Sequence, residues 1–133
     1  MGLNTTKLTV DQALNLWRLT VVESVRRDTP DLSSRQMAVL LTVYLTPAPH
    51  TVRGLARVLD ISKPAVTRAL DRLGEYGLLA RKVDETDRRS VLVQRTPEGQ
   101  NFLAAHADLV IRGVDAATLA DNDLTSVPSL EVA

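Results

Sequence analysis

The side chains best suited to chemistry in this sequence are hydroxyl and basic groups gathered between residues 62 and 72. They are Ser62, Lys63, Thr67, Arg68 and Arg72. Ammonium and guanidinium groups attract phosphate oxygens, and hydroxyls and the free N–H groups of a helix start donate hydrogen bonds to them. The fork of an arginine also matches the two acceptors of guanine in a DNA major groove. We therefore interpret this run as a nucleic-acid-binding surface, with Arg68 as the residue that contacts bases.

The two arginines of this run also have acidic neighbours, so a second interpretation stays open for each. Asp71 and Glu75 lie three residues after Arg68 and Arg72, a spacing at which helical side chains form solvated ion pairs. For Arg68 we favour base recognition. For Arg72 a phosphate contact and a plain ion pair have equal weight.

A second basic group, Arg88 and Arg89, lies in the polar segment 84–89. The segments on either side, 78–83 and 90–95, are predicted strands because apolar residues recur there with a period of two. Together they predict a hairpin with a basic tip, which is suited to lie along a phosphate backbone or to reach into a minor groove. The simpler interpretation is a charged loop that keeps the hairpin soluble.

Two short helices are predicted to position the first group of residues. The helix over 51–59 can be capped by Thr51, and the helix over 62–73 by Ser62. Apolar residues at helical spacing form their inward faces: Leu55, Val58 and Leu59 in the first helix, and Val66, Ala69, Leu70 and Leu73 in the second. Arg53, at the start of the first helix, is a weaker candidate for a phosphate contact.

The same region carries a family resemblance. The matching positions are Ser62, Pro64, Val66, Thr67, Arg68, Leu73, Gly77, Leu78, Arg81, the run Asp87-Arg88-Arg89 and the turn from Thr96 to Gly99. With these residues in this order and spacing, the chain resembles the MarR family of bacterial winged helix-turn-helix transcriptional regulators over about residues 10–112. A helix-turn-helix segment alone would be a much weaker signal.

The resemblance implies a mainly α fold with a small β-hairpin wing, in which dimerisation helices flank a winged helix-turn-helix at both ends. It implies a sequence-specific transcriptional regulator, here expected to be a repressor, that binds double-stranded DNA as a homodimer. Helix 62–73 would read the major groove and the wing at 84–89 the minor groove. Arg89 would be the inserting residue, with Asp87 bracing the turn through a salt bridge.

We expect one domain over residues 1–133, with the DNA-reading core at about 34–95. Flanking helices at about 10–28 and 97–112 would form the dimer. The first of these has a broad apolar face that carries Trp17, the only tryptophan. That face suits a subunit contact and packing inside its own domain about equally.

The C-terminal segment 113–133 is short and acidic and contains Pro128. We expect it to be a tail with a turn or two of helix around 116–119. Members of the family usually continue into another long apolar helix that wraps the partner subunit. The tail therefore leaves open whether this chain forms the usual intertwined dimer.

Charge is distributed unevenly along a chain whose formal net charge is zero. Residues 50–95 carry ten Lys and Arg against six Asp and Glu, whereas residues 96–133 carry one against six. The positive charge thus coincides with the segment that would face phosphates. The chain has no cysteine, no signal-peptide layout and no apolar run near the length of about 18 residues that a membrane helix needs. These features favour a cytoplasmic protein without a membrane partner.

Catalysis has little support, and no cofactor or metal site is expected. The two histidines, His50 and His106, stand far apart without metal-ligand spacing. The resemblance allows a small-molecule effector, for which Trp17, Met37, Tyr44 and His50 are candidates, although plain core packing is favoured for them. The rival function is a winged-helix protein-interaction module without sequence-specific DNA binding.

Overall fold

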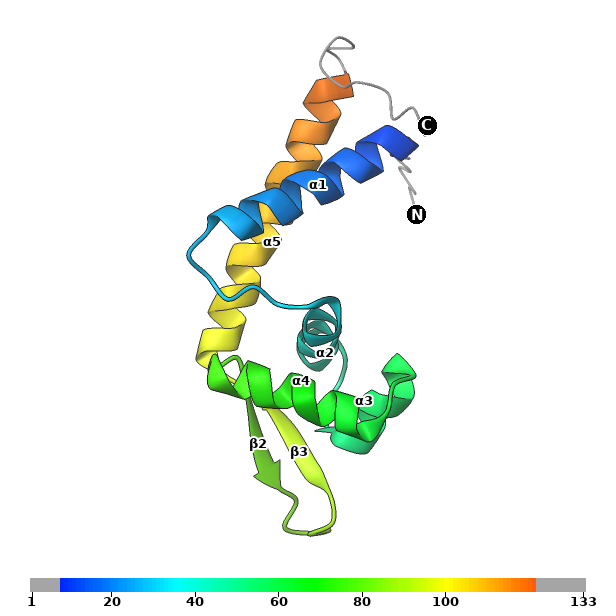
Figure 1. Ribbon diagram of the computed structural model, residues 1–133, viewed down its shortest axis with the longest axis vertical. Helices are drawn as coiled ribbons and strands as arrows, with labels where there is room; N and C mark the ends of the chain where they lie inside the picture. Colours follow the sequence, from blue (N-terminus) through cyan, green and yellow to red (C-terminus); the bar gives the residue numbers. More distant parts are fainter. Residues whose placement is uncertain (1–7, 122–133) are drawn as a thin grey trace. The chain divides into compact units, whose positions relative to one another are not determined.

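The computed structural model describes residues 8–121, with side chains through Ala117, and it is mainly helical with one small sheet. Its elements are α1 (Val10–Arg26), α2 (Ser34–Leu45), β1 (His50–Thr51), α3 (Val52–Leu59), α4 (Lys63–Glu75), β2 (Leu79–Val83), β3 (Val91–Arg95) and α5 (Pro97–Asp121) (Figure 1). The three strands are antiparallel in the order β1-β3-β2. The predicted fold class, helices with a β-hairpin wing, is confirmed.

The chain divides into two compact units. The winged unit is Pro30–Ala104 and contains α2, α3, α4, the sheet and the start of α5. The helical pair consists of α1 and the part of α5 from Ala105 onward.

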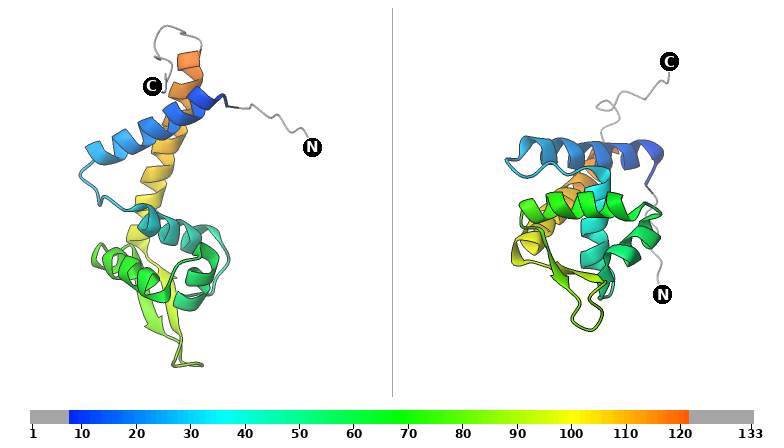
Figure 2. Two further views of the ribbon diagram at one scale, coloured as in Figure 1. Left: turned by 45° about the vertical axis from the view of Figure 1, so that its right-hand side comes forward. Right: turned by 60° about the horizontal axis from the view of Figure 1, so that its bottom comes forward.

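The core of the winged unit is built from leucine and valine side chains on one face of each helix. The fully buried ones are Val39, Leu40, Val43, Leu55, Val66, Leu70 and Leu73. They lie three or four residues apart within α2 and α4, so burying them leaves the opposite face of α4 in solvent. The β2–β3 hairpin projects beyond α2, α3 and α4 (Figure 2). The apolar core therefore fixes which side chains of α4 and of the hairpin face outward.

Side chains and backbone conformation set the ends of α3 and α4. The Thr51 hydroxyl accepts a hydrogen bond from Gly54 N (2.9 Å), and the Ser62 hydroxyl accepts one from Ala65 N (3.2 Å). Asp60 ends α3 in the left-handed conformation, with φ of 53°, and Gly77 has φ of 73° where the chain turns from α4 into β2. The stop at Asp60 and the cap at Ser62 hold α3 and α4 at the close spacing of a helix-turn-helix, and Gly77 directs the chain into β2.

In the helical pair, α1 and α5 approach closely at Gly113. A Cβ atom there would lie 2.7 Å from Leu16 Cδ1 and 3.3 Å from the Thr20 hydroxyl. Thr20 is only 1% exposed and donates its hydroxyl proton to Leu16 O at 2.9 Å. Gly113 is therefore a point of contact between the two helices, where a larger side chain would not fit without movement.

The expectation that the last helix stops near Arg112 is wrong, because α5 continues through Asp121. Glycine in a helix interior costs about 1 kcal/mol relative to alanine, which argued for a stop at Gly113. The close packing at Gly113 and the burial of Ala117 offset that cost. The predicted acidic tail thus loses its first nine residues, 113–121, to the helix, and its remainder, 122–133, lies outside the described residues.

Candidate nucleic-acid interface

The outward face of α4 carries the predicted binding residues. Ser62, Lys63, Thr67, Arg68 and Arg72 are all exposed. They lie opposite Val66, Leu70 and Leu73, whose burial orients the helix. The Ser62 hydroxyl accepts the bond that caps the helix, so its own proton remains available to an acceptor such as a phosphate oxygen.

The two arginines of α4 differ in their neighbours. The Arg72 Nη1 atom lies 2.9 Å from Glu75 Oε2, and the guanidinium lies 5.1 Å from the centre of the Tyr76 ring. Asp71, the acidic neighbour of Arg68, instead pairs with Arg81 of β2 at 2.7 Å. Within residues 8–117, Arg68 has no carboxylate partner. Arg68 is thus available to a ligand, whereas Arg72 already has two contacts on its own helix.

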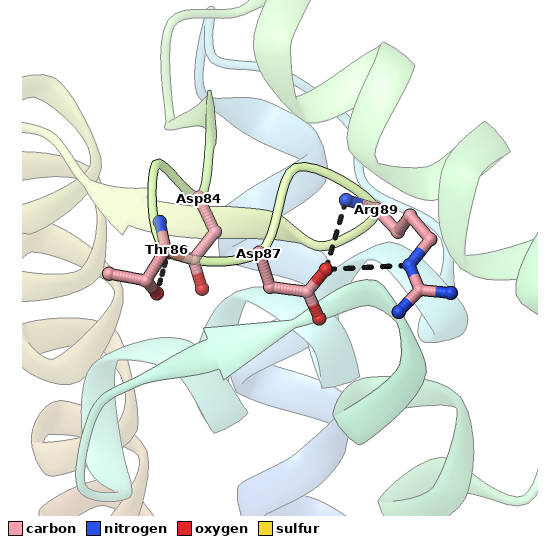
Figure 3. A network of polar contacts seen from close by, with 4 residues as sticks. All are labelled: Asp84, Thr86, Asp87 and Arg89. Atoms are coloured by element: carbon pink, nitrogen blue, oxygen red, sulfur yellow. Dashed lines mark hydrogen bonds and ion pairs between the residues drawn. The ribbon is translucent and has the colours of Figure 1, made fainter.

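The tip of the hairpin is organised by two aspartates (Figure 3). Asp84 Oδ1 accepts hydrogen bonds from Thr86 Oγ1 (2.7 Å) and Thr86 N (3.0 Å). The bond from the Thr86 hydroxyl, then those from the amides, hold the pKa of Asp84 below its ordinary value. These hydrogen bonds give the tip a defined turn conformation.

Asp87 holds the other half of this loop. Its Oδ1 atom accepts a hydrogen bond from Arg89 N at 3.2 Å and lies 3.7 Å from Arg89 Nε (Figure 3). The Arg89 side chain is nevertheless 93% exposed, so this ion pair lies in water and is weak. Asp87 positions Arg89 and leaves its guanidinium accessible.

A cavity of about 470 Å³ lies where α3, α4 and the wing meet. Its lining residues are Thr51, Val52, Arg53, Lys63, Thr67, Asp87, Arg89, Ser90 and Val91. Three cations from three different elements, Arg53, Lys63 and Arg89, thus face one space with a single carboxylate. Such an arrangement attracts an anion at low energetic cost, because the positive charges are already assembled.

Two further exposed cations of the winged unit, Arg57 and Lys82, were not among the residues predicted from the sequence. Arg57 is exposed one helical turn after Arg53, and Lys82 is exposed on β2. Neither has a carboxylate partner in the described part of the chain. The four-residue spacing of Arg53 and Arg57 was a signal that could have identified Arg57, whereas nothing in the sequence distinguishes Lys82 from a solvating charge.

The candidate effector residues belong to two different units. Trp17 belongs to the helical pair and exposes 64% of its surface, so the core packing favoured for it from the sequence is wrong. Met37, Tyr44 and His50 belong to the winged unit. The Tyr44 hydroxyl is fully used in hydrogen bonds within that unit. His50 lines a hollow of about 310 Å³ beside β3, where its ring nitrogen lies 3.0 Å from Thr46 O.

Among residues 8–117, no group of three His, Asp or Glu side chains is placed to hold a metal ion. No helix in the described part of the chain is long and apolar enough to cross a bilayer. What distinguishes the outward face of α4 and the wing is a group of exposed cations, of which Arg68 has no carboxylate partner among residues 8–117.

Known proteins with similar sequences are transcriptional regulators. A model of the MarR family matches residues 31–90. The chain is 39% identical to the HTH-type transcriptional regulator PecS of Dickeya dadantii over 70 residues. This alignment covers 51% of this chain and 42% of PecS. It is 30% identical over 102 residues to an uncharacterized HTH-type transcriptional regulator of Bacillus subtilis, YkoM, covering 71% and 66% of the two chains. The chain therefore spans less than two thirds of the length of either relative.

Solved structures share the fold. A structure of disulfide-formed AbfR aligns with a TM-score of 0.62 at 21% identity, over 85% of this chain and 79% of the other. YusO of Bacillus subtilis aligns with a TM-score of 0.59 at 22% identity, over 89% and 78%. A crystal structure of MarR aligns with a TM-score of 0.59 at 22% identity, over 79% of this chain and 72% of the other. At these identities the likeness establishes the architecture only.

Proposed function

The chain belongs to the MarR family, and from this premise we propose that it is a DNA-binding transcriptional regulator. The observation that carries the proposal is the cavity between α3, α4 and the wing, around which Arg53, Lys63 and Arg89 converge. Phosphate neutralisation supplies most of the affinity of proteins for DNA, and preassembled cations are what it needs. A regulator that binds the chromosome would work in the cytoplasm.

In this proposal α4 enters the major groove and contributes both affinity and specificity. Arg68 contacts base edges, since it is exposed and has no carboxylate partner among the described residues. Ser62, Lys63 and Thr67 hold the flanking phosphates, and Arg72 is a weaker phosphate contact because Glu75 competes for it.

The wing supplies the second contact. We propose that Arg88 and Arg89 reach the minor groove or its rim, with Arg89 exchanging the distant Asp87 carboxylate for phosphate oxygens or base edges. Arg53 adds a phosphate contact from the start of α3. A regulator that covers its site in this way would act as a repressor wherever the site overlaps a promoter.

A homodimer would present two such surfaces to a pseudo-palindromic site. The support is a stripe of exposed apolar residues along α1, namely Val10, Leu14, Trp17, Val21 and Val25, together with the exposed Ile111 of α5. The stripe follows one face of α1, a different face from that of Leu16 and Thr20, which meet Gly113. A continuous apolar stripe on a monomer marks an interaction site, and a second copy of the chain would cover it.

The test is to titrate labelled genomic DNA fragments with the protein at two salt concentrations and to measure binding by fluorescence anisotropy. We expect at least one fragment to bind more tightly than a scrambled duplex, with affinity falling steeply as salt rises. Arg68→Ala should reduce this preference by about 1–3 kcal/mol, whereas the control Arg112→Ala, on α5, should not. Equal binding of all fragments by the unsubstituted protein would contradict the proposal.

The apolar stripe of α1 also fits a second function, a protein-interaction module that uses its basic face only incidentally. This rival predicts weak, sequence-independent DNA binding and a monomeric mass in solution. The two functions are therefore separated by the titration together with a mass measurement in the presence and absence of DNA.

A further inference from the structure

The Tyr44 hydroxyl of α2 forms hydrogen bonds to both ends of the wing. This oxygen lies 3.0 Å from Leu78 O, just before β2, and 2.9 Å from Thr96 O, just after β3. It also accepts a hydrogen bond from Thr96 N at 2.8 Å. Since a phenol has one proton, the two carbonyls share it. One hydroxyl thus connects α2 to both ends of the hairpin.

Gly99 allows the Tyr44 hydroxyl to lie close to the start of α5. A Cβ atom on Gly99, in the first turn of α5, would overlap both the Tyr44 hydroxyl and the Leu78 carbonyl oxygen. The Thr96 hydroxyl donates to Gly77 O (2.6 Å) and accepts from Gly99 N (3.0 Å), which joins the end of α4 to the start of α5. The packing fixes the position of the hydroxyl.

Arg95, the last residue of β3, closes the cluster from the other side. Its Nε and Nη2 atoms donate to Val43 O (3.0 Å) and Thr46 O (3.2 Å) at the end of α2. Its guanidinium lies 5.7 Å from the centre of the Tyr44 ring. The Tyr44 ring is thereby held in place, since the arginine above it is itself bound to the backbone.

We propose that Tyr44 is a positioning residue for DNA binding: it does not contact DNA but sets the orientation of the wing, and with it the position of Arg89. This inference rests on the proposed function. The five residues of β2 span about 16 Å at roughly 3.3 Å per residue, so a rotation of about 5° at the root moves the tip by about 1.4 Å. A shift of that size is enough to break a hydrogen bond to DNA.

A further contact of the hairpin, which links β2 to α4, is weaker. It is the ion pair between Arg81 of β2 and Asp71 of α4, whose side chains are 38% and 54% exposed. An exposed ion pair contributes little to the stability of one geometry. The half-buried Tyr44 hydroxyl, with three backbone partners, is the stronger constraint on the wing.

The test is a double-mutant cycle on DNA affinity, with Tyr44→Phe and Arg89→Ala as the two substitutions. Tyr44→Phe removes only the hydroxyl, and we expect it to weaken binding to a preferred duplex about fivefold, the equivalent of one buried hydrogen bond. In the Arg89→Ala background the same change should weaken binding less than about twofold, because the contact that Tyr44 positions is already lost. The salt dependence should not change with Tyr44→Phe, since no cation is removed.

Tyr76→Phe is the matched control. Tyr76 is another half-buried tyrosine of the winged unit, and its hydroxyl has no hydrogen-bond partner in the described residues. It should leave affinity unchanged. Amide hydrogen exchange provides a readout without DNA: Tyr44→Phe should speed exchange at Thr96 N, which loses its acceptor, while Tyr76→Phe should not.

Two results would overturn the inference. One is unchanged affinity in Tyr44→Phe, and the other is an equal loss with and without Arg89, which would indicate a general loss of stability. In both cases the unsubstituted protein still binds its preferred duplex, so the proposed function stands. If the unsubstituted protein shows no preference among duplexes, the proposed function fails, and the inference fails with it.

Discussion

The exposed tryptophan of α1 provides the sharpest test of how the chain assembles. Trp17 lies in the middle of the apolar stripe and exposes 64% of its surface. A tryptophan presents roughly 250 Å² when fully exposed, so about 160 Å² of each side chain is available to a partner. If a homodimer covers half of that surface on each subunit, the two side chains together bury about 160 Å².

At about 25 cal/mol per Å² this burial contributes about 4 kcal/mol to the dimer. Replacing Trp17 with alanine should therefore raise the dissociation constant of the dimer roughly a thousandfold. Sedimentation equilibrium over a wide range of protein concentration measures this constant directly. The fold of the monomer should be retained, because the side chain lies on the outside of the helical pair.

Val58→Ala is the matched control. The prediction that Val58 faces inward is wrong, because α3 leaves it 69% exposed, similar to Trp17, and it lies far along the chain from the stripe. It should leave the dissociation constant unchanged. The reasoning is refuted if Trp17→Ala and the unsubstituted protein dimerise equally well. A monomer at every concentration in the unsubstituted protein would instead refute the homodimer and favour a different protein as the partner of α1.

Three further perturbations test the basic surface, the helical pair and the wing. Arg57→Ala should lower the slope of log affinity against log salt by about 1.8 for a dimer, two phosphate contacts at about 0.9 each, and an unchanged slope would remove Arg57 from the interface. Gly113→Ala should lower the free energy of unfolding in urea by about 1 kcal/mol, because its Cβ would crowd Leu16, whereas Gly74→Ala, with its nearest neighbour 4.0 Å away, should raise it. The hydrogen bonds to Asp84 lower the pKa of its carboxyl in the folded state. They therefore stabilise the wing at pH values above 3.8, the ordinary pKa of the group, and this stabilisation is lost as the pH falls through the lower pKa of the folded state. Asp84→Asn should abolish that acid transition in the NMR shifts of the wing amides.

Most of the winged unit was predictable because local rules and tertiary packing agree there. Thr51 and Ser62 cap the helices that the sequence assigns to them, and the burial of Val66, Leu70 and Leu73 matches the predicted inward face. The end of α5 was not predictable by the same rules. Gly113 has a poor helix propensity, and only the approach of α1 shows why a glycine is tolerated in the middle of that helix.

The role of Tyr44 was equally hidden from the sequence. Its apolar neighbours at helical spacing indicate a core position, and the resemblance suggested an effector pocket. The three backbone partners of its hydroxyl belong to Leu78 and Thr96, which lie 34 and 52 positions along the chain, so no local sequence pattern predicts these contacts. Long-range polar contacts of this kind are visible only once the elements are in place.

The assignment of roles to the arginines follows the same logic. The sequence places many cations between residues 50 and 95, but it does not distinguish those that hold the fold from those that face a ligand. The structure separates them by their partners: Arg81 pairs with Asp71 and Arg95 binds the end of α2, whereas Arg68 has no carboxylate partner among residues 8–117. Removing Arg81 or Arg95 should therefore lower stability more than DNA binding. Removing Arg68 should do the reverse, so measuring both quantities for each variant tests this separation.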